Sequence, residues 1–179
     1  MIQPSSEAIR IPVPGMCRGS ITSRSASQNG PNPAARMAGT DGPAAARDSF
    51  ITEVVQPALA SAGPGRERLL ALSEGYLSYI ERRVFPGGCF FVAASAEVGA
   101  QAGRVHDEVA RIQQQWRDLL AAEARAAVGQ RELPDGTDAA QLAFELGVIL
   151  AGTDIVSVLH DDLHAISRAR TAIRARLTR

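Results

Sequence analysis

A short break in an otherwise helical pattern, Pro86-Gly87-Gly88-Cys89-Phe90-Phe91, is the first place where this 179-residue chain could do chemistry. It sets a thiol directly after a proline-glycine turn and before two aromatic side chains. A cysteine at a helix start can have a lowered thiol pKa because of the helix dipole, which would suit a thiol sensor. The alternative, which we favour, is a small buried residue in a break whose aromatic residues return to the core.

A second candidate is His160-Asp161-Asp162-Leu163-His164, because histidines at positions i and i+4 can share one face of a helix and bind a metal. Here the pair straddles a turn, and Asp161 or Asp162 is better explained as a helix cap. We therefore predict no metal site. His106 stands alone near a helix start and is interpreted as a solvated residue.

Two carboxylates interrupt the most apolar run of the chain, Leu142–Leu159. Glu145 and Asp154 are nine residues apart, which places them on opposite sides of a helix. Each needs a partner if it is buried. One hypothesis is that one of them meets Arg170 or Arg174 of a second copy while the other reaches a cavity. The alternative is two satisfied charges at helix edges.

Catalysis has no recognisable basis in the sequence, which lacks a nucleophile–base pair, a zinc-type spacing and a phosphate-binding glycine loop. We therefore predict no enzyme activity, no catalytic residue and no cofactor.

The closing arginines also do not predict a nucleic-acid surface, because they split across both flanks of an apolar stripe: Arg168, Arg170, Arg174, Arg176 and Arg179. Tight non-specific DNA binding typically needs about 6–10 phosphate contacts.

The composition is that of an ordinary globular protein, with 45% hydrophobic residues and a formal net charge of zero. All 19 basic residues are arginine, which favours a GC-rich bacterial genome as the source.

Cys17 and Cys89 give no disulfide framework and no signal peptide is visible, so a cytoplasmic location is expected. The apolar run Leu142–Leu159 contains two carboxylates, so we predict a buried helix and no membrane contact.

Two regions differ in their patterns. Residues 1–43 contain six of the ten prolines and no sustained helical or strand period, which predicts a disordered Pro/Ser/Gly-rich tail. Residues 44–179 are predicted to form an all-α domain. About six helices are expected, at residues 43–61, 66–84, 89–99, 104–130, 138–158 and 162–178.

Local signals set several features of these helices. Pro57 lies inside the first helix and should kink or end it. Asp138 is expected to cap the fifth helix, with Gln141 in a capping-box arrangement. That helix is apolar nearly all round, which predicts that both of its faces are covered. Leu163 is expected on the buried stripe of the last helix.

The stretch EVVQPALASAGPGRERLLALSEGYLSYIERRVFPGGCFF, together with DAAQLAFELGVILAG and the Arg-rich last helix, resembles the C-terminal half of TetR-type transcriptional regulators. The resemblance covers roughly Ala44 to Leu177 and is closest to a subgroup with a Phe-Pro-Gly-Gly-Cys break. It implies a helical body that senses a small effector and forms a homodimer through its last two helices.

The resemblance also implies two sets of site residues. An apolar effector is expected in a cavity at Tyr76, Tyr79, Cys89, Phe90, Phe91 and Trp116. The homodimer interface is expected at Gly147, Ala151, Ile155, Ile166, Arg170 and Ile173.

The family's DNA-binding head, which contains a helix-turn-helix, is not recognisable before Ala44. DNA binding is therefore expected of the family but is not supported by this chain. A protein without a head, a misassigned start and an upstream frame shift all remain open. The alternative function is a stand-alone helical binding module that pairs with an intact relative.

Overall fold

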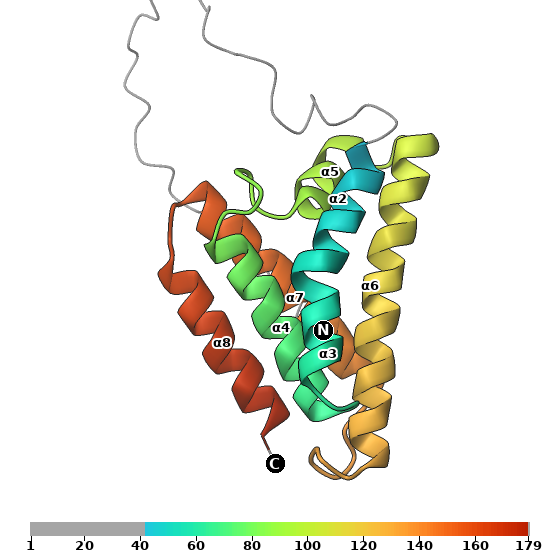
Figure 1. The fold of residues 1–179 in the computed structure, drawn as a ribbon, viewed down its shortest axis with the longest axis vertical. Helices are drawn as coiled ribbons and strands as arrows, with labels where there is room; N and C mark the ends of the chain where they lie inside the picture. The colour runs from blue at the N-terminus through green and yellow to red at the C-terminus, as the bar shows by residue number, and fades with distance from the viewer. Residues whose placement is uncertain (1–41, 179) are drawn as a thin grey trace, which may run out of the picture. The chain divides into compact units, whose positions relative to one another are not determined.

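The computed structural model describes residues 42–178, which are helical and contain no β-strand, so the predicted all-α fold is confirmed. The predicted tail lies outside the described residues except for Gly42 and Pro43, which begin α2. Figure 1 shows the helices in chain order: α2 (Gly42–Phe50), η1 (Ile51–Val55), α3 (Gln56–Ser61), α4 (Arg66–Glu81), α5 (Phe90–Val98), α6 (Arg104–Gly129), α7 (Ala139–Leu159) and α8 (His164–Leu177).

The first three elements form one rod with a π-helical turn in its middle. In that turn the Gln56 N–H donates to the Ile51 carbonyl oxygen, five residues back. Proline has no N–H, and its ring would clash with the carbonyl four residues earlier in a regular α-helix. The wider turn immediately before Pro57 accommodates both effects. The predicted interruption is therefore present, as a π-turn in a rod that continues to Ser61.

The rods pack side by side, and Figure 1 shows α4 between α8 and the α2–α3 rod, with α6 on the far side of that rod. Helix α7 crosses behind them and contacts α4, α5, α6 and α8. It thus links the last helix to the helices that surround the break before α5.

Helix α4 supplies the centre of the core through the predicted stripe. Leu69, Leu72, Tyr76 and Ile80 recur at spacings of three and four, and each is at most 4% exposed. Gly75 lies on the face toward the first rod, where a Cβ atom would come within 3.3 Å of the Val54 carbonyl oxygen. The missing side chain lets α4 and η1 approach closely.

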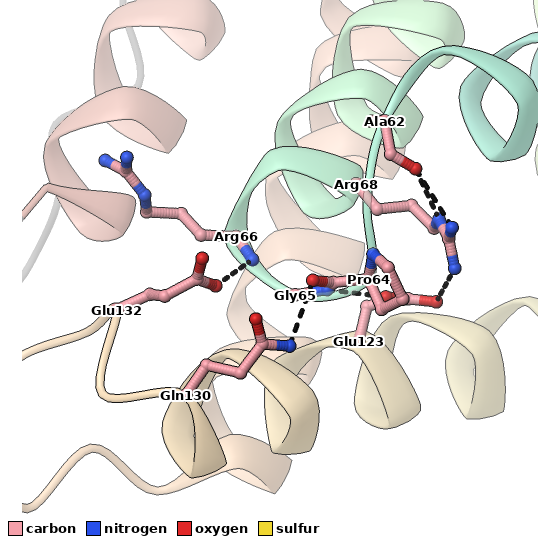
Figure 2. A network of polar contacts seen from close by, with 8 residues as sticks. All are labelled: Ala62, Pro64, Gly65, Arg66, Arg68, Glu123, Gln130 and Glu132. Carbon is pink, nitrogen blue, oxygen red and sulfur yellow. Dashed lines mark hydrogen bonds and ion pairs between the residues drawn. The ribbon is translucent and has the colours of Figure 1, made fainter.

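A buried polar network fixes the turn between α3 and α4 to the end of α6 (Figure 2). The Glu123 carboxylate accepts hydrogen bonds from the Gly65 N–H at 2.9 Å and from the Arg68 guanidinium at 3.2 Å. Glu132 accepts from the Arg66 N–H at 2.8 Å. These bonds satisfy backbone donors at the start of α4, where a helix has no internal partners for them.

Helix α7 begins as predicted, because the Asp138 carboxylate accepts from the N–H groups of Ala140 and Gln141. Among the described residues the Asp138 N–H makes no hydrogen bond to the Gln141 side chain, so the reciprocal half of the capping box is absent, and the Gln141 amide nitrogen donates to Glu145. Among residues 42–178, α7 is the one helix long and apolar enough to cross a membrane, with a mean hydropathy of 1.9. Such a value also fits a core helix, and 39% of that window is buried here.

Within the protomer, one face of α7 is covered and the other is open. Phe144, Val148 and Ile155 are 61%, 54% and 51% exposed. Coverage of both faces therefore stays a prediction, because the second face would need a partner. Leu163, expected on the buried stripe of α8, is also exposed, at 52%.

Candidate functional site

A cavity of about 390 Å³ lies among α2, α4, α5, α6 and α7, and its volume falls in the range of small-molecule sites. Most of its lining is apolar. The lining side chains come from the first rod (Arg47, Phe50, Ile51, Val55), from α4 and the start of α5 (Tyr76, Cys89, Phe91, Val92), from α6 (Ile112, Gln113, Gln115, Trp116, Arg117, Leu119) and from α7 (Ala143, Phe144, Gly147, Val148, Leu150, Ala151).

Phe50 is the centre of an aromatic cluster in the cavity wall. Its ring meets Trp116 edge-to-face at a centroid distance of 5.2 Å and Tyr76 at 5.9 Å. Tyr76 in turn stacks on Trp116 at 6.1 Å. Edge-to-face and offset-stacked rings stabilise one another and restrict each other's rotamers. The cluster therefore gives the cavity a rigid aromatic wall contributed by α2, α4 and α6.

Burial governs the ionisation of Cys89, which directly precedes α5, and of Tyr76 on α4. It raises the pKa of the Cys89 thiol, which a hydrogen bond with the Tyr76 side chain partly offsets. It also raises the pKa of Tyr76 well above its usual value. Both groups are therefore neutral at pH 7. The thiol-sensor hypothesis required a lowered thiol pKa, so the environment of Cys89 favours the alternative of a small buried residue.

Asp154 lies behind this part of the lining. Its carboxylate accepts a 2.9 Å hydrogen bond from the Cys89 N–H, and the side chain is almost completely buried. Burial raises the pKa of Asp154 from 3.8 to about 6, against the lowering effect of that hydrogen bond. This bond ties α7 to the residue at which the chain re-enters the cavity wall.

Four of the six residues predicted to bind an effector line the cavity: Tyr76, Cys89, Phe91 and Trp116. Tyr79 and Phe90 do not. The Tyr79 ring is buried beside Phe50, and the Phe90 ring packs between Phe85 and Phe91 in the core. The effector-binding role of all six stays a prediction.

Sequence reasoning missed several lining residues, of which Phe50, Arg47 and Arg117 have the most consequence for chemistry. Phe50 is on the apolar side of its predicted helix, which is a signal for burial but not for a cavity. No local pattern distinguishes Arg47 and Arg117 from the other arginines, because which one borders a cavity depends on how α2 and α6 pack.

The residues predicted for a dimer interface fall into three groups. Ile155 is exposed, and Gly147 and Ala151 are half-buried beside the cavity. Ile166 and Ile173 are at most 2% exposed, because they pack into the protomer's own core. Their side chains have almost no surface left for a second copy.

The charge pairing proposed across a dimer is not supported by the contacts within the chain. Arg170, which was also predicted for the interface, donates to Glu74 at 2.9 Å and to Glu81 at 2.6 Å, both on α4. Glu145 accepts from Arg176 at 2.6 Å. These acids and arginines therefore have partners in their own protomer.

The histidine pair does not form a site with the neighbouring acids. His160 and His164 are both exposed. The Asp162 carboxylate accepts from the His164 N–H at 2.9 Å, as expected for a cap at the start of α8. Asp161 pairs with Arg83. Both acids therefore have structural partners.

Comparisons with known proteins identify one family and one similar fold. A family model described as "Tetracyclin repressor-like, C-terminal domain" matches residues 65–173. Among solved structures, that of a TetR transcriptional regulator from Chloroflexus aurantiacus J-10-fl is similar, with a TM-score of 0.68 and 17% sequence identity. The likeness covers 75% of this chain and 67% of that one, and at this identity it concerns the fold alone. No curated protein matches the chain.

Proposed function

We propose, from the premise that this chain belongs to the tetracyclin repressor-like C-terminal domain family, that its helices sense a small ligand and pair two copies of a TetR-type regulator. The observation that carries the proposal is the 390 Å³ cavity, which borders an exposed apolar face on α7. The two features fit the two tasks of a sensing and dimerising body.

The cavity supports ligand sensing through its position in the fold. Its walls include Phe50, Ile51 and Val55 of the first rod, whose π-helical turn departs from regular helix geometry. Such turns are frequent at functional sites. A ligand that contacts these side chains would favour one of two arrangements of the rod over the other.

The exposed face of α7 supports self-association. Phe144, Val148 and Ile155 share one side of the helix, and Leu159 continues it at 72% exposure. Contiguous exposed apolar surface on a globular protein marks an interaction site. A second copy related by two-fold symmetry would bury the same face on both protomers. Phe144 and Val148 also line the cavity, so pairing would cover part of its rim.

Light scattering on the purified chain tests self-association. We expect a dimer, and we expect Ile155→Asp to convert it into a monomer, because the charge would be buried without a partner. Ile155 does not line the cavity, so the variant separates pairing from ligand binding. Leu59→Asp is the matched control, since Leu59 is 42% exposed on α3. A wild-type monomer, or loss of pairing in the control, would contradict this part.

A neutral probe tests the cavity without involving charge. N-phenyl-1-naphthylamine becomes fluorescent in apolar surroundings, and we expect it to bind with one site per chain. The fluorescence of Trp116, the one tryptophan of the sequence, should change in parallel because its ring is in the cavity wall. Absence of both signals would refute ligand sensing at this site.

A further inference from the structure

The charges in the cavity lining have one sign. The charged side chains among the lining residues are Arg47 and Arg117, and the lining contains no aspartate or glutamate. The titratable groups Tyr76 and Cys89 add no negative charge at pH 7, because burial raises the pKa of each. A mostly apolar cavity therefore has two arginines and no acid among its lining residues.

Of the two arginines in the lining, Arg117 has the charge that is less neutralised by its neighbours. Its guanidinium donates to the Gln114 side-chain oxygen at 2.7 Å, and no carboxylate of residues 42–178 lies within ion-pair distance of it. Arg117 is exposed, and it is among the residues that line the cavity. An arginine bound only to a neutral amide keeps donors and charge available for a ligand.

Arg47 adds a second charge from the neighbouring helix. It precedes Phe50 by about one helical turn, and α2 and α6 lie side by side in Figure 1. Its guanidinium pairs with Asp48 at 2.8 Å, but the Asp48 side chain is 67% exposed. Such exposed pairs contribute little and are easily exchanged. Arg47 can therefore assist Arg117.

We propose that the ligand of this cavity is a small amphipathic anion with an apolar body and one carboxylate. The apolar body lies against the cluster of Phe50, Tyr76 and Trp116, and the carboxylate binds Arg117 with assistance from Arg47. The inference rests on the proposed ligand-sensing function and makes it more specific, because an apolar cavity alone would not discriminate between anions, neutral molecules and cations.

The chemistry of guanidinium explains the preference. Its planar set of donors matches the two oxygens of a carboxylate, and charge-assisted hydrogen bonds are stronger than neutral ones. A cationic ligand would meet the same arginines with like charge. The Gln113 amide nitrogen is not a competing donor for the carboxylate, because it already donates to the Ser95 hydroxyl and to the Phe91 carbonyl oxygen.

Three probes with the same ten-carbon chain test the sign of the charge: decanoate, 1-decanol and decylamine, each below its aggregation concentration. Trp116 fluorescence reports binding. We expect decanoate to bind on the order of tenfold more tightly than 1-decanol, as one charge-assisted hydrogen bond would give, and decylamine to bind least. The advantage of decanoate should shrink as salt is added.

Matched variants locate the effect. Arg117→Gln should remove most of the preference for decanoate while leaving 1-decanol affinity unchanged. Arg125→Gln removes the same charge from an exposed position on α6 outside the cavity and should preserve the preference. Equal binding of decanoate and 1-decanol, or an equal loss in both variants, would overturn the inference and leave the ligand-sensing function standing. If no probe binds, the proposed function fails with it.

Discussion

The Asp154 carboxylate accepts a 2.9 Å hydrogen bond from the backbone N–H of Cys89, across 65 residues of sequence. The bond joins the proposed pairing helix α7 to the start of α5, where the chain enters the cavity wall. Because the carboxylate is buried, its ionisation depends on the fold, and this makes the bond accessible to a pH experiment.

Asp154→Asn should change the pH dependence of stability. Burial raises the pKa of Asp154 from 3.8 to about 6, so the folded state binds a proton more tightly than the unfolded state. The resulting stabilisation is fully present below pH 3.8 and is lost as the pH rises through 6. It amounts to at most about 3 kcal/mol. Asparagine keeps a side-chain oxygen that can accept from the Cys89 N–H. In the variant, the free energy of unfolding measured with urea should therefore lack this decrease between pH 4 and 7.

Glu145→Gln is the control, because the pKa of Glu145 is shifted in the opposite direction to that of Asp154. Hydrogen bonds from Gln141 and then Arg176 lower the pKa of Glu145, so its contribution is lost as the pH falls through that lowered pKa. The variant should therefore lose this contribution near neutral pH and should differ from the wild type less as the pH falls, while the pH dependence between 4 and 7 that is assigned to Asp154 is kept. An unchanged slope in Asp154→Asn would show that the carboxylate is not the titrating group.

Gly88→Ala should be strongly destabilising, whereas Gly87→Ala should not. Gly88 has a φ of +80°, and an added Cβ atom would collide with the Asp154 carboxylate and the Val158 side chain. Backbone strain and overpacking together cost about 2–4 kcal/mol. No atom lies within 4 Å of a Cβ at Gly87, so that variant should stay within about 0.5 kcal/mol. Thermal unfolding of the pair measures the difference, and equal losses would contradict the assigned geometry.

Glu123→Ala should lower the free energy of unfolding by about 2–4 kcal/mol, because it leaves the Gly65 N–H without its acceptor and a mostly buried Arg68 without its carboxylate partner. Arg68 keeps its hydrogen bonds to the Ala62 carbonyl oxygen. Glu123→Gln retains an oxygen for Gly65 and should lose less. Glu108→Gln breaks an exposed pair with Arg111 on the same helix and should change little. Chemical denaturation compares the three, and a neutral Glu123→Ala would show that the network in Figure 2 does not stabilise the α3–α4 turn.

Gly147→Leu should fill part of the cavity without unfolding the protein. Gly147 lines the cavity, and no atom lies within 4 Å of the position that its Cβ would occupy. Replacing a helical glycine also stabilises a helix by about 0.5–1 kcal/mol. We expect N-phenyl-1-naphthylamine binding to fall while the melting temperature is kept or raised. Ala122→Leu, at an exposed α6 position outside the lining, should preserve binding. Full binding by Gly147→Leu would place the probe elsewhere.

Local patterns in the sequence determined the helices. The stripe of Leu69, Leu72 and Tyr76 predicts a buried helix face, and Asp138 predicts a helix start, because periodicity and capping depend on neighbours a few residues away. The Pro-Gly-Gly break required a residue with positive φ, which Gly88 provides. The family resemblance also came from such local stretches.

Only the tertiary structure decided which face of each helix meets which neighbour. Ile166 and Ile173 were expected at a partner but fill the protomer's core, while Phe144 and Val148 are exposed. Arg117 borders a cavity and Arg125 does not, although both are arginines on one helix. A periodic pattern gives the apolar side of a helix but not its rotation against other helices, because that rotation is set by long-range packing.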